Sequence, residues 1–264
     1  MHKTIILLFV LMLGNQLGSQ AAFASKLKKF DPAPVFVGYQ AAFVLEALGS
    51  GERICLNESG CRKRYSPCST FKIFNSLVGL ETGVLRNENH VMAWDGTKYG
   101  IESWNRGQSL QSAVNNSCVW YFQRVATRVG IKRMRSYIEK SAYGNMDIKG
   151  GVRTFWLDSS LSISPFEQIE FLKRLVKDDL PFSKRSTGIV RCMLRQQESA
   201  SGILYGKTGS SKANGKNVLG WYVGYLVQPQ ETYVFATNIR ADDGAWGPKA
   251  KALTITILKD MKLL

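Results

Sequence analysis

The sequence predicts an α+β fold, in which N- and C-terminal segments form an antiparallel sheet with flanking helices and a helical region is inserted between the two halves. The first part of the chain has extended character, the middle has helical patterns, and three successive strand patterns lie near the C-terminus. Strands at both ends with helices between them are typical of α+β layering. The 264 residues, 45% of them hydrophobic, suffice for one large domain or two closely packed ones.

The first strands are expected between residues 34 and 56. This region contains VFVGYQAAFVLEAL, a Gly-Ser-Gly turn and RICL. The first helix is expected to follow, with Ser66 as its N-cap and Pro67 in its first helical position. Gly83 is expected to end that helix, because glycine readily takes the backbone conformation found just after a helix.

The next segments predict further helices and then strands. Residues 119–130 and 131–142 form amphipathic patterns separated at Gly130, and Ser164 with Glu167 predicts a capping box for the helix that follows. Strands are predicted at 202–209, 219–228 and 231–239, and a closing helix is predicted from Gly247-Pro248 onward.

Residues 1–24 are predicted to be a cleaved secretory signal. They combine a basic start at Lys3, a short apolar run and the small-x-small ending Ala22-Phe23-Ala24, so cleavage is expected before Ser25. A single membrane anchor is the alternative, which the short apolar run disfavours. Residues 25–264 would then form one exported domain, periplasmic and not integral to a membrane, as a monomer or homodimer.

The net charge of +15 raises the question of nucleic acid as a partner. Cleavage of the signal removes Lys3 and no acidic residue, which leaves +14. The basic residues are scattered, export separates the protein from nucleic acid, and no reader motif occurs. A solvated basic surface is therefore the preferred interpretation, and its charge would attract anionic substrates.

Cysteine and histidine limit the possible chemistry. Of the five cysteines, Cys55 and Cys61 flank a turn-like stretch, and their spacing permits a disulfide without establishing one. No Cys-x-x-Cys pair exists, so no zinc site or other metal site is expected. The mature chain keeps only His90, so a Ser-His-Asp triad would have to use this loop residue.

Ser69 and Lys72 form the first candidate site. Three residues apart in one helical turn, they lie on the same face. A serine becomes a nucleophile when a nearby base removes its proton, and lysine can be that base when burial keeps it neutral. Phe71, Ile73, Phe74 and Val119 are expected to supply the apolar surroundings. This pair alone recurs by chance in many helices.

Two further elements strengthen the interpretation. Lys207-Thr208-Gly209, at the end of a predicted strand, offers a cation and a hydroxyl for a substrate carboxylate, and its glycine permits close backbone approach. Ser117 lies just before a predicted helix, where a plain N-cap is the alternative role. Penicillin-recognising serine enzymes combine Ser-x-x-Lys with Ser-Asp-Asn and Lys-Thr-Gly. Here the middle element is Ser117-Cys118-Val119.

With these elements in order, nearly the whole mature chain resembles a class D (OXA-type) serine β-lactamase, and thus a fold of the serine β-lactamase/transpeptidase type. The stretches GLETGVL, WDG and ISPFEQIEFL are also typical of that family. The ordered motifs that carry the resemblance are Ser69-Thr70-Phe71-Lys72, Ser117-Cys118-Val119, Tyr143-Gly144-Asn145, Trp156-Leu157 and Lys207-Thr208-Gly209.

The resemblance implies hydrolysis of penicillin-type β-lactam antibiotics, and hence antibiotic resistance. No separate cofactor is implied, but Lys72 would react with CO2 to give a carbamate. Val119 would keep its pocket dry, and the indole N–H of Trp156 would satisfy the buried anion. Simple core packing is the alternative role for Trp156.

The resemblance also implies the roles of the other site residues. The carbamate would deprotonate Ser69 for acylation and later activate the water that releases the acyl group. The backbone N–H groups of Ser69 and Ser210 would hold the oxyanion, and Ser117 would relay a proton to the leaving nitrogen. Lys207 would supply positive potential, while Thr208 would bind the substrate carboxylate.

The chain departs from the family pattern at one binding position. Many members carry a carboxylate-binding arginine near the C-terminal helix, and NIRADDGAWGPKAKALT has no clear equivalent. Lys251 and Arg240 are the candidates, and a lysine would act as a point charge rather than a planar fork. Cys118 is expected to be a small buried hydrophobe beside the site, and Tyr143-Gly144-Asn145 to shape its wall.

Two other functions share the same nucleophile. A penicillin-binding transpeptidase would pass the acyl group to an amine, and the sensor domain of a β-lactam receptor would stay acylated. Val119 and Trp156 argue against the transpeptidase. The predicted signal peptide and the lack of preceding membrane helices argue against the sensor.

Overall fold

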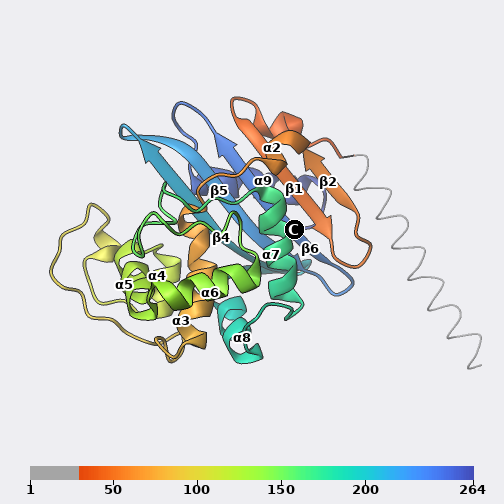
Figure 1. The fold of residues 1–264 in the computed structure, drawn as a ribbon. Helices are drawn as coiled ribbons and strands as arrows, with labels where there is room; N and C mark the ends of the chain where they lie inside the picture. The colour runs from red at the N-terminus through yellow and green to blue at the C-terminus, as the bar shows by residue number, and fades with distance from the viewer. Residues whose placement is uncertain (1–29) are drawn as a thin grey trace, which may run out of the picture.

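Strands from the N-terminal and C-terminal parts of the described chain form one six-stranded sheet (Figure 1). A computed structural model of the protein describes residues 30–264, so the predicted signal at residues 1–24 lies outside the described range. The strand order is β2-β1-β6-β5-β4-β3, and every neighbouring pair is antiparallel. The strands are β1 (Gln40–Ala47), β2 (Arg53–Leu56), β3 (Arg195–Ser199), β4 (Gly202–Ala213), β5 (Lys216–Val227) and β6 (Thr232–Arg240).

The pairing of β1 with β6 joins the two halves of the chain. Its register runs from Gln40 opposite Arg240 to Ala47 opposite Tyr233. The helical region enters after β2 and leaves before β3. The predicted α+β fold, with one antiparallel sheet built from both ends of the chain, is therefore confirmed. Edge strand β3 was not predicted, because its residues are polar and mostly exposed.

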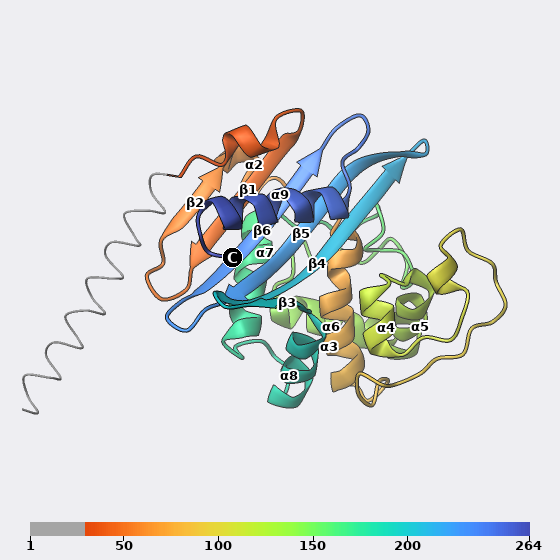
Figure 2. The same cartoon turned by 180° about the vertical axis from the view of Figure 1, so that it is seen from behind.

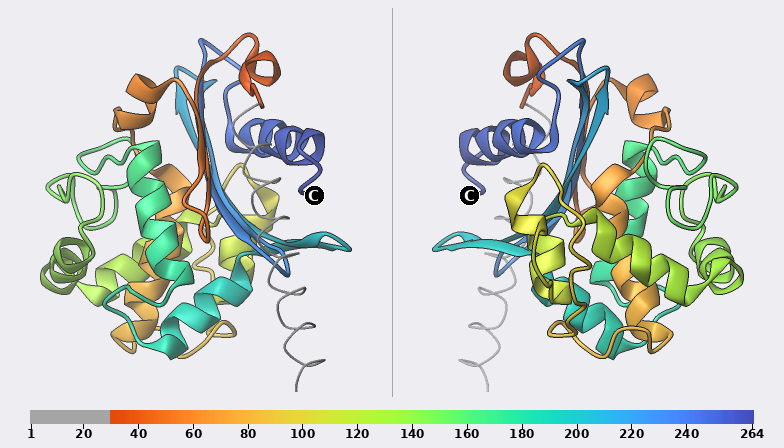
Figure 3. Two further views of the ribbon diagram at one scale, coloured as in Figure 1. Left: turned by 90° about the vertical axis from the view of Figure 1, so that its right-hand side faces the viewer. Right: turned by 90° about the vertical axis from the view of Figure 1, so that its left-hand side faces the viewer.

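Helices cover both faces of the sheet, as the edge-on views in Figure 3 show. The C-terminal helix α9 (Gly247–Asp260) lies across one face, which Figure 2 brings to the front, and the 3-10 helix Ala33–Phe36 packs beside it. The other face carries α2 (Glu58–Arg62), α3 (Lys72–Glu81), α4 (Leu110–Asn115), α5 (Val119–Val129), α6 (Ile131–Ser141), α7 (Pro165–Val176) and α8 (Lys184–Met193). Short 3-10 helices span Ala33–Phe36, Cys68–Phe71 and Glu102–Trp104. Within residues 30–264, no helix combines the length and apolar character that crossing a membrane requires.

Two hydrophobic cores follow from the alternation of side chains along the strands. In β6, Val234 and Ala236 join the core beneath the helical region, whereas Tyr233 and Phe235 join the core beneath α9. Full burial of such a side chain contributes roughly 1.5–3 kcal/mol to folding. The sheet is therefore fixed from both sides and provides a rigid support for residues along β4.

The helices that the sequence predicts have the expected boundaries except at the first one, whereas α2, α4 and α8 were not predicted. The expectation of extended chain from residue 34 is wrong at its start, because Ala33–Phe36 form a 3-10 helix and β1 begins at Gln40. Ser164 and Glu167 form the predicted capping box, and Gly83 follows α3 with a φ of 72°. Ser66 does not cap α3. Its hydroxyl donates instead to the carbonyl of Trp156, and the chain passes through a 3-10 turn before α3 begins at Lys72.

We expect Cys55 and Cys61 to form a disulfide in protein recovered from an oxidising compartment. Cys55 is half-buried in β2, Cys61 is buried in α2, and their sulfurs lie 3.4 Å apart as free thiols in this structure. A small side-chain rotation would bring them to bonding distance. Closing so short a loop would add about 2 kcal/mol to the free energy of unfolding. Thiol titration of the denatured protein should find three free thiols rather than five.

The Cys55→Ser variant provides the control. It should lose the thermal stabilisation that the oxidised protein gains over the reduced one. Five free thiols in protein exported through an oxidising compartment would contradict the prediction.

Candidate active site

The residue that precedes Ser69 has an unusual backbone conformation. Cys68 has a φ of 49°, in the left-handed region that residues other than glycine seldom adopt. Such a conformation costs about 1 kcal/mol or more and persists where the surrounding structure enforces it. It turns the chain so that the half-buried Ser69 stands in the 3-10 turn just before α3, within reach of Lys72, the first residue of that helix.

Lys72 contacts Ser69 directly. Its Nζ lies 2.6 Å from the Oγ of Ser69, and its side chain has no exposed surface. Burial lowers the pKa of Lys72 to about 7, although the thiols of Cys118 and Cys68 act in the opposite direction. A large fraction of this amine is therefore neutral near pH 7, as a base for the serine hydroxyl requires.

A second lysine approaches a second serine nearby. Lys207, in β4, donates from Nζ to the Oγ of Ser117 at 2.9 Å and to the carbonyl of Thr208 at 3.1 Å. Burial, with added repulsion from Lys72 and Lys251, holds the pKa of Lys207 well below its usual value. Residues 90 positions apart in the sequence thus form one polar cluster.

Ser117 is not a helix N-cap. The cap position of α5 belongs to Cys118, and Ser117 has a φ of 53°, which places its side chain toward Lys207. The alternative role that sequence permits for Ser117 is therefore wrong. Cys118 is fully buried, as predicted, and burial raises the pKa of its thiol.

Gly209 allows β4 to pass close to the serine turn. A Cβ atom at this position would lie 3.0 Å from the carbonyl oxygen of Pro67 and 3.2 Å from the Cγ2 of Thr70. Ser210 follows Gly209, and its Oγ accepts a hydrogen bond from the backbone N–H of Gly247 at 2.9 Å. The strand that carries Lys207 and Ser210 is thus held against the turn that carries Ser69.

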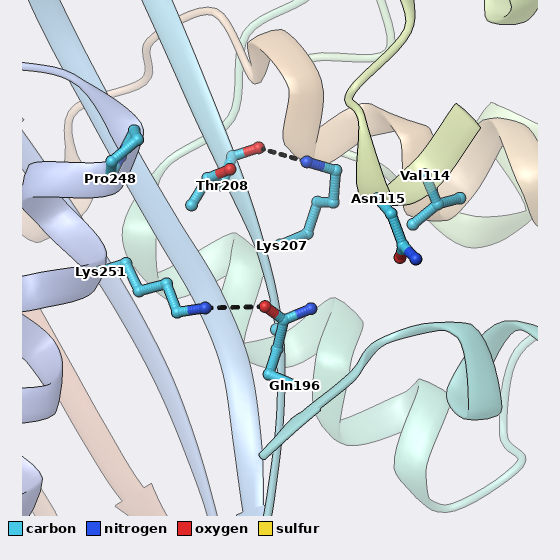
Figure 4. Close-up of a pocket in the computed structure, with 8 residues that line it drawn as sticks. Val114, Asn115, Gln196, Lys207, Thr208, Pro248 and Lys251 are labelled. Carbon is cyan, nitrogen blue, oxygen red and sulfur yellow. Dashed lines mark hydrogen bonds between the residues drawn. The ribbon is translucent and has the colours of Figure 1, made fainter. Parts of the chain in front are cut away.

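A pocket of about 300 Å³ opens beside Lys207 (Figure 4). None of the described residues that line it is acidic, and two of them are lysines. Across it, the Nζ of Lys251 in α9 donates to the Oε1 of Gln196 in β3 at 2.8 Å. Its lining consists of Val114, Asn115, Gln196, Gly206, Lys207, Thr208, Pro248 and Lys251. This composition suits an anionic group.

Arg240, the other candidate for the carboxylate, does not line this pocket. Its guanidinium lies over the ring of Tyr65, 4.5 Å from the ring centroid. The structure therefore places Lys251, and not Arg240, beside Lys207 and Thr208.

Trp156 is fully buried in the core beneath the helical region. It stacks on Phe71 with ring centroids 5.4 Å apart, so it does pack in the core as the simpler interpretation expects. However, its Nε1 has no hydrogen-bond partner among residues 30–264. A buried N–H without a partner is costly, so this donor requires an acceptor that the described residues do not supply.

The other predicted site residues occupy supporting positions. Val119 is half-buried as the first residue of α5. Tyr143 is buried with its ring 5.6 Å from that of Phe71, and Asn145 ties its loop by donating to the carbonyl of Ser160. The ring of His90 accepts a weak bond from the N–H of Arg86, a local loop role.

Sequence reasoning missed two residues of the site. The ring centroid of Phe122 lies 5.6 Å from the Nζ of Lys72. Phe122 could have been predicted, because it follows Val119 by three residues and so shares its face of the helix. Gln196 sits where the register of β3 shifts against β4, and nothing in its polar surroundings marks it in the sequence. Within the described range, no group of three or more His, Cys, Asp or Glu side chains is placed to hold a metal.

A sheet covered by helices on both faces, with a serine–lysine pair at a helix start beside a Lys-Thr-Gly strand, defines the penicillin-recognising serine class. Residues 25–259 match the model of the penicillin binding protein transpeptidase domain. The chain belongs to this family and, within it, to the class D serine β-lactamases.

Individual relatives support this assignment. A probable β-lactamase of Bacillus subtilis, YbxI, is 41% identical over 90% of this chain and 87% of its own. The crystal structure of a class D β-lactamase from Bacillus subtilis matches this chain with 40% sequence identity and a TM-score of 0.86. The match covers 90% of this chain and 98% of that one. The regulatory protein BlaR1 of Bacillus licheniformis is 36% identical over 76% of this chain, which spans only 33% of BlaR1.

Proposed function

We propose that this protein hydrolyses β-lactam antibiotics of the penicillin type through an acyl-enzyme on Ser69, and thereby confers resistance to them. The observation that carries the proposal is the 2.6 Å contact between Ser69 Oγ and the fully buried Nζ of Lys72, whose pKa burial lowers to about 7. An activated serine in this class of fold attacks the β-lactam carbonyl, and its ester must then be hydrolysed to complete turnover.

The remaining residues are assigned by their positions. Backbone N–H groups of Ser69 and Ser210 would hold the oxyanion, because Gly209 brings β4 against the serine turn. Ser117 would deliver a proton to the leaving nitrogen, since its Oγ contacts the Nζ of Lys207 at 2.9 Å. Lys207 would supply the positive potential at that point.

We further propose that Lys72 is carbamylated by CO2. A neutral buried amine and the unpartnered indole N–H of Trp156 both fit such a group. When present, the carbamate supplies one anionic base for acylation and for deacylation. Apart from this modification, no cofactor is proposed. Val119 and Phe122 would help to exclude water from Lys72.

Turnover of a chromogenic cephalosporin tests the proposed function. Sustained colour formation far beyond one equivalent of enzyme would support a hydrolase. A single stoichiometric burst would instead support a receptor like BlaR1. The similarity of the chain to that regulatory protein favours this as the second candidate function. A burst whose acyl group passes to an added amine would support a transpeptidase.

We expect Lys251→Ala to weaken substrate binding while kcat changes little. Lys251 lines the pocket with Lys207 and Thr208, where the substrate carboxylate would bind. A charge-assisted hydrogen bond contributes roughly 1.5–3 kcal/mol, so KM for a penicillin should rise at least tenfold. Because burial lowers the pKa of Lys251, binding should also weaken as pH rises through that lowered pKa. Steady-state kinetics across pH measure both effects.

Lys249→Ala is the matched control, because Lys249 belongs to the same helix but lies over the ring of Tyr39. A penicillin methyl ester has no free carboxylate, so its KM should be the same for Lys251→Ala as for wild type. If Arg240→Ala raised KM while Lys251→Ala did not, the carboxylate site would belong to Arg240.

A further inference from the structure

Ser66 holds the segment that leads into the serine turn. Its hydroxyl donates to the carbonyl of Trp156 at 3.0 Å and accepts from the N–H of Asp158 at 2.9 Å. Its own carbonyl accepts from the indole N–H of Trp221 at 2.9 Å. The chain just before Ser69 is therefore attached both to the loop that carries Trp156 and to strand β5.

Asp158 attaches that loop to strand β4. Its Oδ2 accepts a hydrogen bond from the Oγ of Ser211 at 2.5 Å, the length of a charge-assisted bond. Ser211 is buried and directly follows Ser210. Asp158 has a φ of 49°, a conformation that aspartate tolerates better than most residues, and its own N–H is the group that binds Ser66.

These contacts close a ring. Ser66 is hydrogen-bonded to Asp158, and Asp158 is hydrogen-bonded to Ser211 in β4. Two residues before Ser211, Gly209 pairs with Trp221 in β5, and the indole of Trp221 is hydrogen-bonded back to Ser66. The contact between Asp158 and Ser211 is the one link in this ring made by two side chains. Every other link uses at least one backbone group, so this link can be removed without altering the backbone.

We propose that Asp158 is a positioning residue that, through this ring, sets the Ser210 backbone N–H relative to the Ser69 hydroxyl. The inference rests on the proposed roles of these two groups as oxyanion donor and nucleophile. Oxyanion stabilisation depends on donors fixed in place before the reaction, and a displacement of about 1 Å can cost about 100-fold in rate. Asp158 itself touches no reacting atom.

Acylation rates in matched variants test the proposal. Asp158→Ala and Ser211→Ala should each slow acylation by a fluorescent penicillin about 10- to 100-fold in single-turnover experiments. Both remove the contact between Asp158 and Ser211, and Asp158→Ala also removes the 3.9 Å contact between its Oδ1 and the Sγ of Cys68, so the double variant should be no slower than Asp158→Ala. Asp158→Asn keeps an acceptor oxygen and should fall between wild type and Asp158→Ala. Asp147→Ala is the control, since that carboxylate accepts only a local bond from the N–H of Lys149.

A boronic acid that forms a tetrahedral adduct on Ser69 provides the second readout. Its affinity should fall by the same factor as the acylation rate, which mere loss of thermal stability would not produce. Acylation within twofold of wild type in Asp158→Ala, or losses that multiply in the double variant, would overturn the proposal. Acylation is shared by hydrolase and receptor, so a wild-type protein that acylates without turnover would refute the hydrolase and leave this test valid.

Discussion

Lys72→Ala should abolish nearly all β-lactam turnover. Lys72 is the one amine in contact with Ser69 Oγ among residues 30–264, at 2.6 Å, and its pKa near 7 allows it to act on the serine. Loss of a general base typically slows a reaction about 10²–10⁴-fold, and here the same residue would serve both halves of the cycle. We therefore expect both acylation and deacylation to slow, measured separately by single-turnover and steady-state kinetics. Lys132→Ala, on the exposed side of α6, should leave both rates unchanged.

The buried amine of Lys72 should lower the stability of the folded protein even though activity requires it. A lysine whose pKa is about 7 when folded and near 10.5 when unfolded binds fewer protons in the folded state between these values. The folded protein therefore loses stability as pH falls from about 10.5 to about 7, and the penalty remains at lower pH. Lys72→Met keeps the shape of the side chain without the charge, so its Tm at pH 6 should exceed that of wild type while turnover is lost. Normal turnover in either variant would refute the assignment of the base.

How far the sequence predicts this site depends on the distance between partners along the chain. Ser69 and Lys72 share a helical turn, so their spacing alone placed them on one face. Ser117 and Lys207 come from different layers, and no local pattern relates them; the family resemblance supplied that relation. Such contacts depend on how α5 docks against the sheet, which is decided by packing of the whole core.

The residues that the sequence did not reveal have a common physical origin. Serine is a preferred N-cap residue, yet the hydroxyl of Ser66 donates to the carbonyl of Trp156. A tertiary hydrogen bond has taken the place of the local capping bond. Cys68 is left-handed although cysteine has no preference for that conformation. Gln196 reaches Lys251 from an irregular edge strand. In each case the surrounding fold overrides the local preference, at positions beside Ser69 or along the pocket that Lys207 lines.

Trp156 should govern the response of the proposed β-lactamase activity to bicarbonate. CO2 adds only to a neutral amine, so wild-type activity should fall on prolonged incubation below the Lys72 pKa of about 7 without bicarbonate, and should return when bicarbonate is added. Trp156→Phe keeps a packed ring beside Phe71 but removes the buried N–H. It should therefore lose activity about 10- to 100-fold even at pH 8, since a buried anion without its donor costs about 1–3 kcal/mol.

Carbon-13 NMR with labelled bicarbonate gives a direct measurement for this prediction. Wild type should show a carbamate signal that weakens as pH falls, and Trp156→Phe should need more bicarbonate to reach the same signal. Trp94→Phe is the matched control, because the indole of Trp94 already donates to the carbonyl of Thr97 in a surface loop. Activity that is independent of bicarbonate across this pH range would refute the carbamate while leaving Ser69 as nucleophile. Lys72 would then act as a free amine, and the unpartnered N–H of Trp156 would require another acceptor.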